Sequence, residues 1–172
     1  MLYCFIIYYI RNESKKPVNQ PRQPLKINVG FLVNQNVGTY RDFDFEYDHL
    51  TLARDLVLTD FSGVARIGRT AQGLLVQGDF WAKMDLECVR CLTEFKQDLR
   101  ADFKELYAFH ERDMTDSELL LPENGFIDLE ALVREYMLLE VPIRPVCRPD
   151  CKGLCPVCGA DLNHEDCGHQ SR

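Results

Sequence analysis

Strict alternation of apolar and polar side chains is the feature of this sequence that most restricts its fold. From residue 74 to residue 88 the even positions are apolar or small, whereas the odd positions carry the charges. After Cys91 the phase is reversed, and through residue 109 the odd positions are mostly apolar. A period of two indicates β-strands with one buried face. The sequence therefore predicts two long neighbouring strands that share an apolar face.

The connection between these strands sets their register. A two-residue turn at residues 89–90 would place Cys88 opposite Cys91 and Met84 opposite Phe95. All the apolar pairs then fall on the same face, so this register is self-consistent. The turn lacks the Asn-Gly chemistry that favours a tight two-residue connection.

The remaining pattern completes the predicted domain. Alternation predicts further strands over residues 25–29, 40–47 and 57–67, with Val57 on the buried face of the last. An apolar stripe with 3.6-residue spacing predicts one amphipathic helix, which Asp128 caps and Pro142 ends. The polar stretch 111–124 is expected to be a mobile surface loop. The expected class is α+β: a curled, mostly antiparallel sheet with one packed helix and a C-terminal zinc knuckle.

Four cysteines crowd the C-terminal region in the order Cys147, Cys151, Cys155 and Cys158. Zinc takes four tetrahedral ligands, and a shell of four thiolates is typical of a structural site. Two thiolates in a Cys-x-x-Cys sequence can grip one ion when the backbone between them forms a tight turn. These four residues are therefore the predicted ligands of one structural Zn²⁺. A disulfide scaffold would need a denser cysteine content than this chain has.

The second Cys-x-x-Cys, Cys88 to Cys91, leaves alternatives open. One zinc could instead use this pair together with Cys155 and Cys158, which would leave the other two tail cysteines unexplained. The local set is preferred because closing short loops costs less entropy. Cys167 is a further candidate ligand, whereas His164 and His169 are expected to be solvated.

Composition and the N-terminal sequence limit the remaining classes. The net charge of −7 argues against a protein coated in basic surface for non-specific nucleic-acid binding. Residues 1–10 are apolar, but a bilayer span needs about 20 such residues, and no signal-peptide cleavage pattern follows. Residues 1–24 are expected to be a disordered or misannotated extension, 25–141 the core domain, and 142–172 a proline-rich connector with the cysteine-rich tail. The expected location is cytoplasmic, with no membrane partner.

No phosphate-binding loop, zinc-hydrolase motif or nucleophile elbow is present, so no enzyme is predicted.

Two sequence motifs resemble a known family. They are Cys-Val-Arg-Cys-Leu after the long strand, and Cys-Lys-Gly-Leu-Cys-Pro-Val-Cys-Gly-Ala-Asp-Leu-Asn, which ends at residue 163. Together with the helix between them, they resemble the YceD-like family of bacterial and plastid large ribosomal RNA subunit accumulation proteins. The resemblance implies a non-enzymatic bacterial cytoplasmic factor that is needed for normal levels of large-subunit ribosomal RNA (rRNA). Our hypothesis is a ribosome-biogenesis factor that acts by binding this rRNA or a ribosomal protein of the large subunit. The apolar start departs from the family pattern.

Any contact with RNA phosphates would need clustered basic side chains. The candidates surround the two cysteine motifs and are Arg90, Arg144, Arg148 and Lys152. Ordinary surface charge is an equal explanation for these four. The alternative function is a thiol-based redox or metal-responsive regulator that uses Cys88 and Cys91 as its switch.

Overall fold

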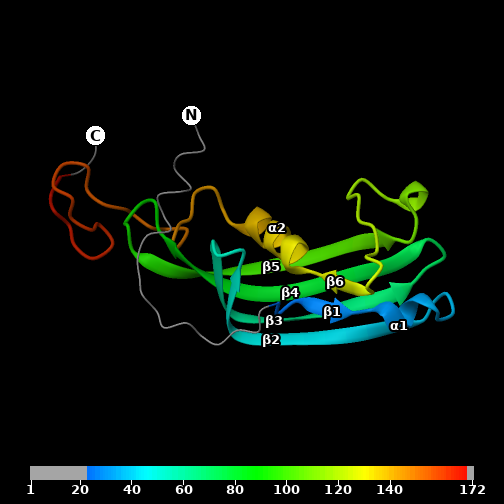
Figure 1. The fold of residues 1–172 in the computed structure, drawn as a ribbon. Helices are drawn as coiled ribbons and strands as arrows, with labels where there is room; N and C mark the ends of the chain where they lie inside the picture. The colour runs from blue at the N-terminus through cyan, green and yellow to red at the C-terminus, as the bar shows by residue number, and fades with distance from the viewer. Residues whose placement is uncertain (1–22, 170–172) are drawn as a thin grey trace.

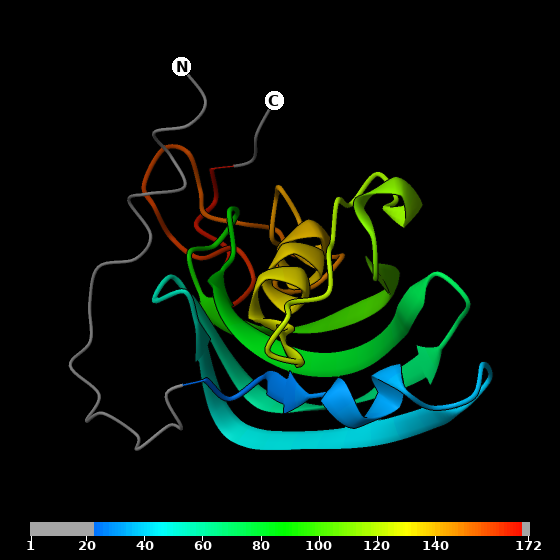
Figure 2. The ribbon, with the colours of Figure 1, turned by 45° about the vertical axis from the view of Figure 1, so that its right-hand side comes forward.

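The computed structural model describes residues 23–169, and its central element is a four-stranded antiparallel sheet. The strands lie in the order β2 (Tyr40–Leu52), β3 (Leu56–Arg69), β4 (Gly73–Glu87) and β5 (Glu94–Ala108). The sheet is strongly curved without closing, and the main helix, α2 (Glu130–Glu140), lies on its concave side (Figure 2). Short strands β1 (Lys26–Asn28) and β6 (Phe126–Asp128) form a separate antiparallel pair, and α1 (Gly30–Val33) follows β1. The predicted α+β class is confirmed.

Aromatic side chains fill the concave face of the sheet. Phe80 is fully buried, and its ring centroid lies 5.4 Å from that of Phe61 and 6.0 Å from that of Phe103. Tyr136 of α2 stacks on Phe103 at 4.9 Å and donates a 2.8 Å hydrogen bond to the Glu105 carboxylate. These contacts fix α2 on β5, and the chain leaves the helix toward the turn between β4 and β5 (Figure 1).

The pairing of β4 with β5 corrects the predicted register by two residues. The last pair is Glu87 with Glu94, and Leu86 rather than Met84 lies opposite Phe95. The turn therefore holds six residues, 88–93, instead of two. Because a shift of two leaves every side chain on its own face, the predicted buried face is nevertheless observed.

A bulge in β3 corrects the face assigned to Val57. This side chain is 55% exposed, whereas its neighbour Leu58 is fully buried. Asp60 has a φ of +51°, and the pairing of β3 with β4 shifts between Thr59 and Ser62. One residue in the left-handed conformation reverses the alternation. The buried residues of β3 are therefore even-numbered before the bulge and odd-numbered after it.

Two contacts position α2, one at its start and one to the sheet. The Glu130 N–H donates a 2.9 Å hydrogen bond to the Asp128 carboxylate at the start of the helix. Arg134 forms two hydrogen bonds to the Asp55 carboxylate in the β2–β3 turn. The predicted helix and its end before Pro142 are confirmed.

The segment between β5 and β6 contains a short 3₁₀ helix, η2 (Glu111–Asp113). After this helix the chain turns back to the end of β5, where the Leu121 N–H donates a 2.8 Å hydrogen bond to the Ala108 carbonyl. No helix within residues 23–169 is long and apolar enough to cross a bilayer. The predictions for residues 1–22 lie outside the described residues.

Candidate metal centre

The β4–β5 turn forms a tight knuckle that could present two thiols to a metal ion. The Cys88 N–H donates to the Thr93 carbonyl at 2.9 Å, and the Leu92 N–H donates to the Cys88 carbonyl at 2.9 Å. The Arg90 N–H points at the Cys88 sulfur from 3.4 Å. Leu92 closes the turn with a φ of +60°, a conformation that usually favours glycine. This backbone turns both thiols of the Cys-x-x-Cys sequence to one side.

The C-terminal tail crosses this knuckle through backbone contacts. The Val89 N–H donates to the Pro145 carbonyl, and the Leu154 N–H donates to the Arg90 carbonyl, both at 2.9 Å. The tail backbone passes close to Arg90 at Gly153, whose φ is +78° and where an added Cβ would lie 3.0 Å from the Arg90 carbonyl oxygen. Only glycine fits there without displacing the tail.

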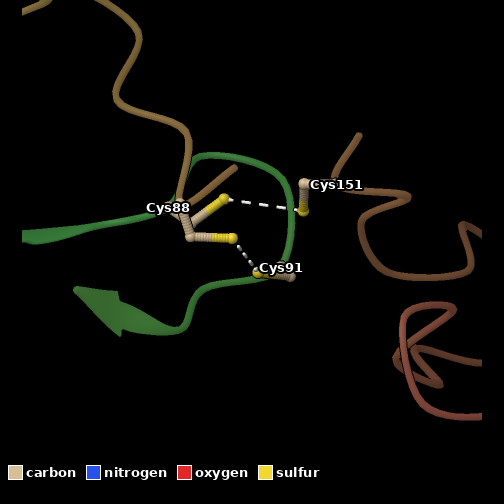
Figure 3. Close-up of side chains that lie close together, drawn as sticks. Cys88, Cys91 and Cys151 are labelled. Carbon is tan, nitrogen blue, oxygen red and sulfur yellow. Dashed lines mark hydrogen bonds between the residues drawn. The ribbon is translucent and has the colours of Figure 1, made fainter. Parts of the chain in front are cut away.

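Four sulfur atoms meet where the tail crosses. The Cys88 and Cys151 sulfurs are 3.8 Å apart, the Cys91 and Cys147 sulfurs 3.7 Å, and all four lie within 4.8 Å of one another. Figure 3 shows Cys88, Cys91 and Cys151 converging from the knuckle and the tail. Sulfurs about 2.3 Å from a tetrahedral zinc are separated by about 3.8 Å. The two shortest separations therefore match the edges of a zinc-thiolate tetrahedron.

The electrostatics of the group also suit a cation. Burial disfavours the Cys88 thiolate, but backbone N–H groups, including that of Arg90, outweigh it and lower its pKa to about 6. The hydroxyl and backbone of Thr93 lower the pKa of Cys91. Burial and the adjacent Cys91 sulfur raise the pKa of Cys147 to about 12. Four close sulfurs cannot all ionise by themselves, whereas a bound divalent ion would hold all of them as thiolates.

The four ligands predicted from the tail are divided between two places. Cys147 and Cys151 join Cys88 and Cys91, while Cys155 and Cys158 form a second group with other residues of the tail. The structure therefore does not bring the predicted set together, nor does it pair the two Cys-x-x-Cys sequences.

The predicted basic residues have different surroundings. The Arg90 guanidinium donates a 2.9 Å hydrogen bond to the Cys151 carbonyl, and Arg148 bonds the Asn163 side chain at 3.0 Å and pairs with Asp150. Arg144 and Lys152 are exposed. Two of the four candidates, Arg90 and Arg148, thus already form hydrogen bonds to residues of the tail.

Asn163 organises the tail, and the sequence analysis gave it no role. Its side-chain oxygen accepts hydrogen bonds from the Lys152 N–H at 2.8 Å and from Arg148. Its amide nitrogen donates to Asp161 at 2.7 Å and faces the Cys151 sulfur at 3.5 Å. The only sequence signal for this residue is its place at the end of the cysteine motif.

The fold and the site define a small α+β protein whose cysteine-rich tail docks on the sheet through a thiolate group able to hold a metal ion. Residues 76–172 match the family model described as "Large ribosomal RNA subunit accumulation protein YceD". Because that match spans more than half of the sequence, the chain belongs to the YceD family.

Individual relatives agree with this assignment. A protein of Mycobacterium tuberculosis described as uncharacterised is 30% identical over 156 residues, which cover 86% of this chain and 74% of the relative. The chloroplastic "Large ribosomal RNA subunit accumulation protein YCED homolog 1" of Arabidopsis thaliana is 37% identical over 62 residues, 35% of this chain and 19% of the plant protein. The Zea mays protein of the same name is 49% identical over 37 residues, covering 22% and 13%. The comparison with solved structures found no match. The family and plant names support a ribosome-related role.

Proposed function

We propose that this protein is a non-enzymatic, cytoplasmic factor of a bacterium that supports accumulation of large-subunit (23S) rRNA by binding a component of the assembling subunit. The family description and the names of the plant relatives support the ribosomal part. The observation that carries the binding role is the docking of the tail across the β4–β5 turn by four sulfurs within 4.8 Å. This junction makes one surface from two distant segments.

The metal proposed for this junction is zinc, with Cys88, Cys91, Cys147 and Cys151 as its ligands. A shell of four thiolates is characteristic of structural zinc and leaves no coordination position for a substrate. Zinc would supply the positive charge that keeps all four sulfurs ionised. Its contribution would be to fold and orient the tail, which supports a binding protein over an enzyme.

The proposed partner is a basic ribosomal protein of the large subunit. The net charge of −7 favours a positively charged partner, and the exposed Arg90 and Arg148 side chains already form contacts within the protein. Purified protein would be tested against RNA-free large-subunit proteins and against deproteinised large-subunit rRNA. Retention of a defined ribosomal protein supports the proposal. Binding to rRNA alone, with log affinity falling by about 0.7 per phosphate contact per decade of salt, would replace it with an RNA-binding role.

The cellular role is tested by depletion. Loss of the protein is expected to lower the ratio of large- to small-subunit rRNA, and the wild-type chain should restore it. The double variant Cys88→Ser/Cys91→Ser should not restore it, whereas Val37→Ala, which changes a side chain 65% exposed, should. An unchanged ratio on depletion would refute the ribosomal role.

The redox alternative requires oxidants to reach Cys88 and Cys91. These side chains are fully buried and 7% exposed, respectively, which disfavours a fast thiol switch. Differential alkylation under mild oxidant distinguishes the two functions. Oxidation of this pair ahead of Cys158, which is exposed, would support the regulator instead.

A further inference from the structure

A second group of metal-binding side chains lies wholly within the tail. It consists of Cys155, Cys158, Cys167 and His169, whose ligand atoms lie within 4.8 Å of one another. We propose that these four residues hold a second zinc ion, separate from the ion at the β4–β5 turn. The inference concerns metal content and does not depend on the ribosomal role.

The backbone at residues 155–160 repeats the fold of the first knuckle. The Cys155 N–H donates to the Ala160 carbonyl at 2.8 Å, as Cys88 donates to Thr93. The Gly159 N–H donates to the Cys155 carbonyl at 2.9 Å, and the Val157 N–H faces the Cys155 sulfur at 3.4 Å. Each of these contacts has its counterpart, at the same sequence offset, in the turn at residues 88–93.

The backbone conformation at the end of each knuckle also agrees. Gly159 has a φ of +77°, and Leu92, at the equivalent position, has +60°. Two segments with different sequences thus adopt one ligand-presenting geometry. Since each knuckle turns two thiols to one side, each needs two more ligands from elsewhere to close a tetrahedron.

The Cys-Gly-His sequence at residues 167–169 supplies the missing pair at the second site. Gly168 has a φ of +72°, and its N–H donates a 2.9 Å hydrogen bond to the Asp166 carboxylate. This turn brings the Cys167 sulfur and the His169 imidazole into the same group as the knuckle. Three thiolates and one imidazole form a common structural zinc set.

The two sites differ in their exposure to solvent. At the first site Cys88, Cys91 and Cys151 are buried, whereas at the second only Cys155 is buried, and Cys158 and His169 are exposed. A chelator therefore reaches the second ion directly, while the first is covered by the packed tail. The second ion should leave first.

Metal analysis of the full chain, purified under reducing conditions with zinc, tests the proposal. The expected content is two zinc ions per chain, falling to one in Cys155→Ser/Cys158→Ser and to one in Cys88→Ser/Cys91→Ser. X-ray absorption should give about 3.5 sulfur and 0.5 nitrogen ligands per zinc in the wild type. It should give four sulfurs in the first variant, and three sulfurs with one nitrogen in the second. Stepwise chelation of the wild type should remove the ion with the nitrogen ligand first.

A pair of single histidine variants provides the control if a double variant does not fold. His169→Ala should remove the nitrogen ligand, whereas His164→Ala, whose imidazole lies 3.6 Å from Asp161 outside the group, should leave it. One zinc per wild-type chain would overturn the proposal, as would loss of both ions in either double variant. A disulfide between two of the thiols of residues 155–167 in the metal-loaded protein would also overturn the proposal.

Discussion

Replacing one tail ligand of the first site tests whether metal binding docks the tail. In Cys151→Ser a buried sulfur, 3.8 Å from that of Cys88, gives way to a hydroxyl that does not ionise at neutral pH. Structural zinc sites bind with about 10–16 kcal/mol, so one of four thiolates carries roughly 3 kcal/mol. This corresponds to about a 100-fold change in an equilibrium constant.

Amide hydrogen exchange measures the change at the junction itself. The Val89 and Leu154 N–H groups both donate across it, so each should exchange about 100-fold faster in Cys151→Ser. Cys158→Ser is the matched control, because it alters a tail thiol of the second group only. The amides of paired core residues such as Phe80 and Ala101 should keep their protection in both variants. Unchanged exchange at the junction, or equal loss of protection across the sheet, would refute the reasoning.

Three further predictions concern the stability of the sheet. Phe80→Ala should lower the free energy of unfolding by about 3–5 kcal/mol in denaturant titrations, because it empties the centre of the aromatic core. The Trp81 side chain points outward and is 45% exposed, so Trp81→Ala should lower the free energy of unfolding by under about 1.5 kcal/mol. Equal effects would contradict the assigned faces. Ala53 and Arg54, in the β2–β3 turn, have φ of +46° and +65°. Asn-Gly at these positions should therefore raise the midpoint of thermal unfolding by a few degrees. An unchanged or lower midpoint would argue against that backbone conformation. The hydrogen bonds from the Arg134 guanidinium of α2 lower the pKa of Asp55. Their contribution to the free energy of unfolding is therefore complete above the unfolded pKa of about 4 and is lost as the pH falls through the lower folded value. Asp55→Asn should remove this part of the acid dependence in unfolding titrations, and an unaltered profile would exclude it.

The strands and their buried faces could be predicted because alternation is a local property. Burial follows the predicted parity through β4 and β5, where no bulge interrupts the pattern. The errors arise where a single residue adopts a left-handed conformation. Asp60 reverses the parity of β3, and Leu92 extends the β4–β5 turn to six residues. Leucine gives no sign of such a conformation, and aspartate, although enriched there, adopts it at only a small fraction of its positions, so a pattern of hydrophobicity alone cannot locate these two residues.

The membership of the metal sites could not be predicted, because it depends on the folded path of the chain. The cysteine spacing pointed to residues that the structure places in groups able to hold a metal, but it grouped them by their distance along the sequence. Closing the loop from Cys91 to Cys147 looks costly for a free chain. In the folded protein most of that loop is already ordered by β5 and by α2, which stacks Tyr136 on Phe103. The packed helix thus shortens the free part of the chain that must close to bring Cys147 to the turn.

A metal at the first group of cysteines would have a specific physical role. The sheet has its own apolar core, and the cysteines of the knuckle form a separate small cluster with Phe95, Val146 and Leu154. Few apolar side chains are buried in that cluster, whereas fixing each residue of the tail costs about 1–2 kcal/mol of backbone entropy. Metal-thiolate bonds would supply that free energy at one point without enlarging the core. We therefore expect the sheet to fold without a metal, and the surface that joins the turn to the tail to depend on one.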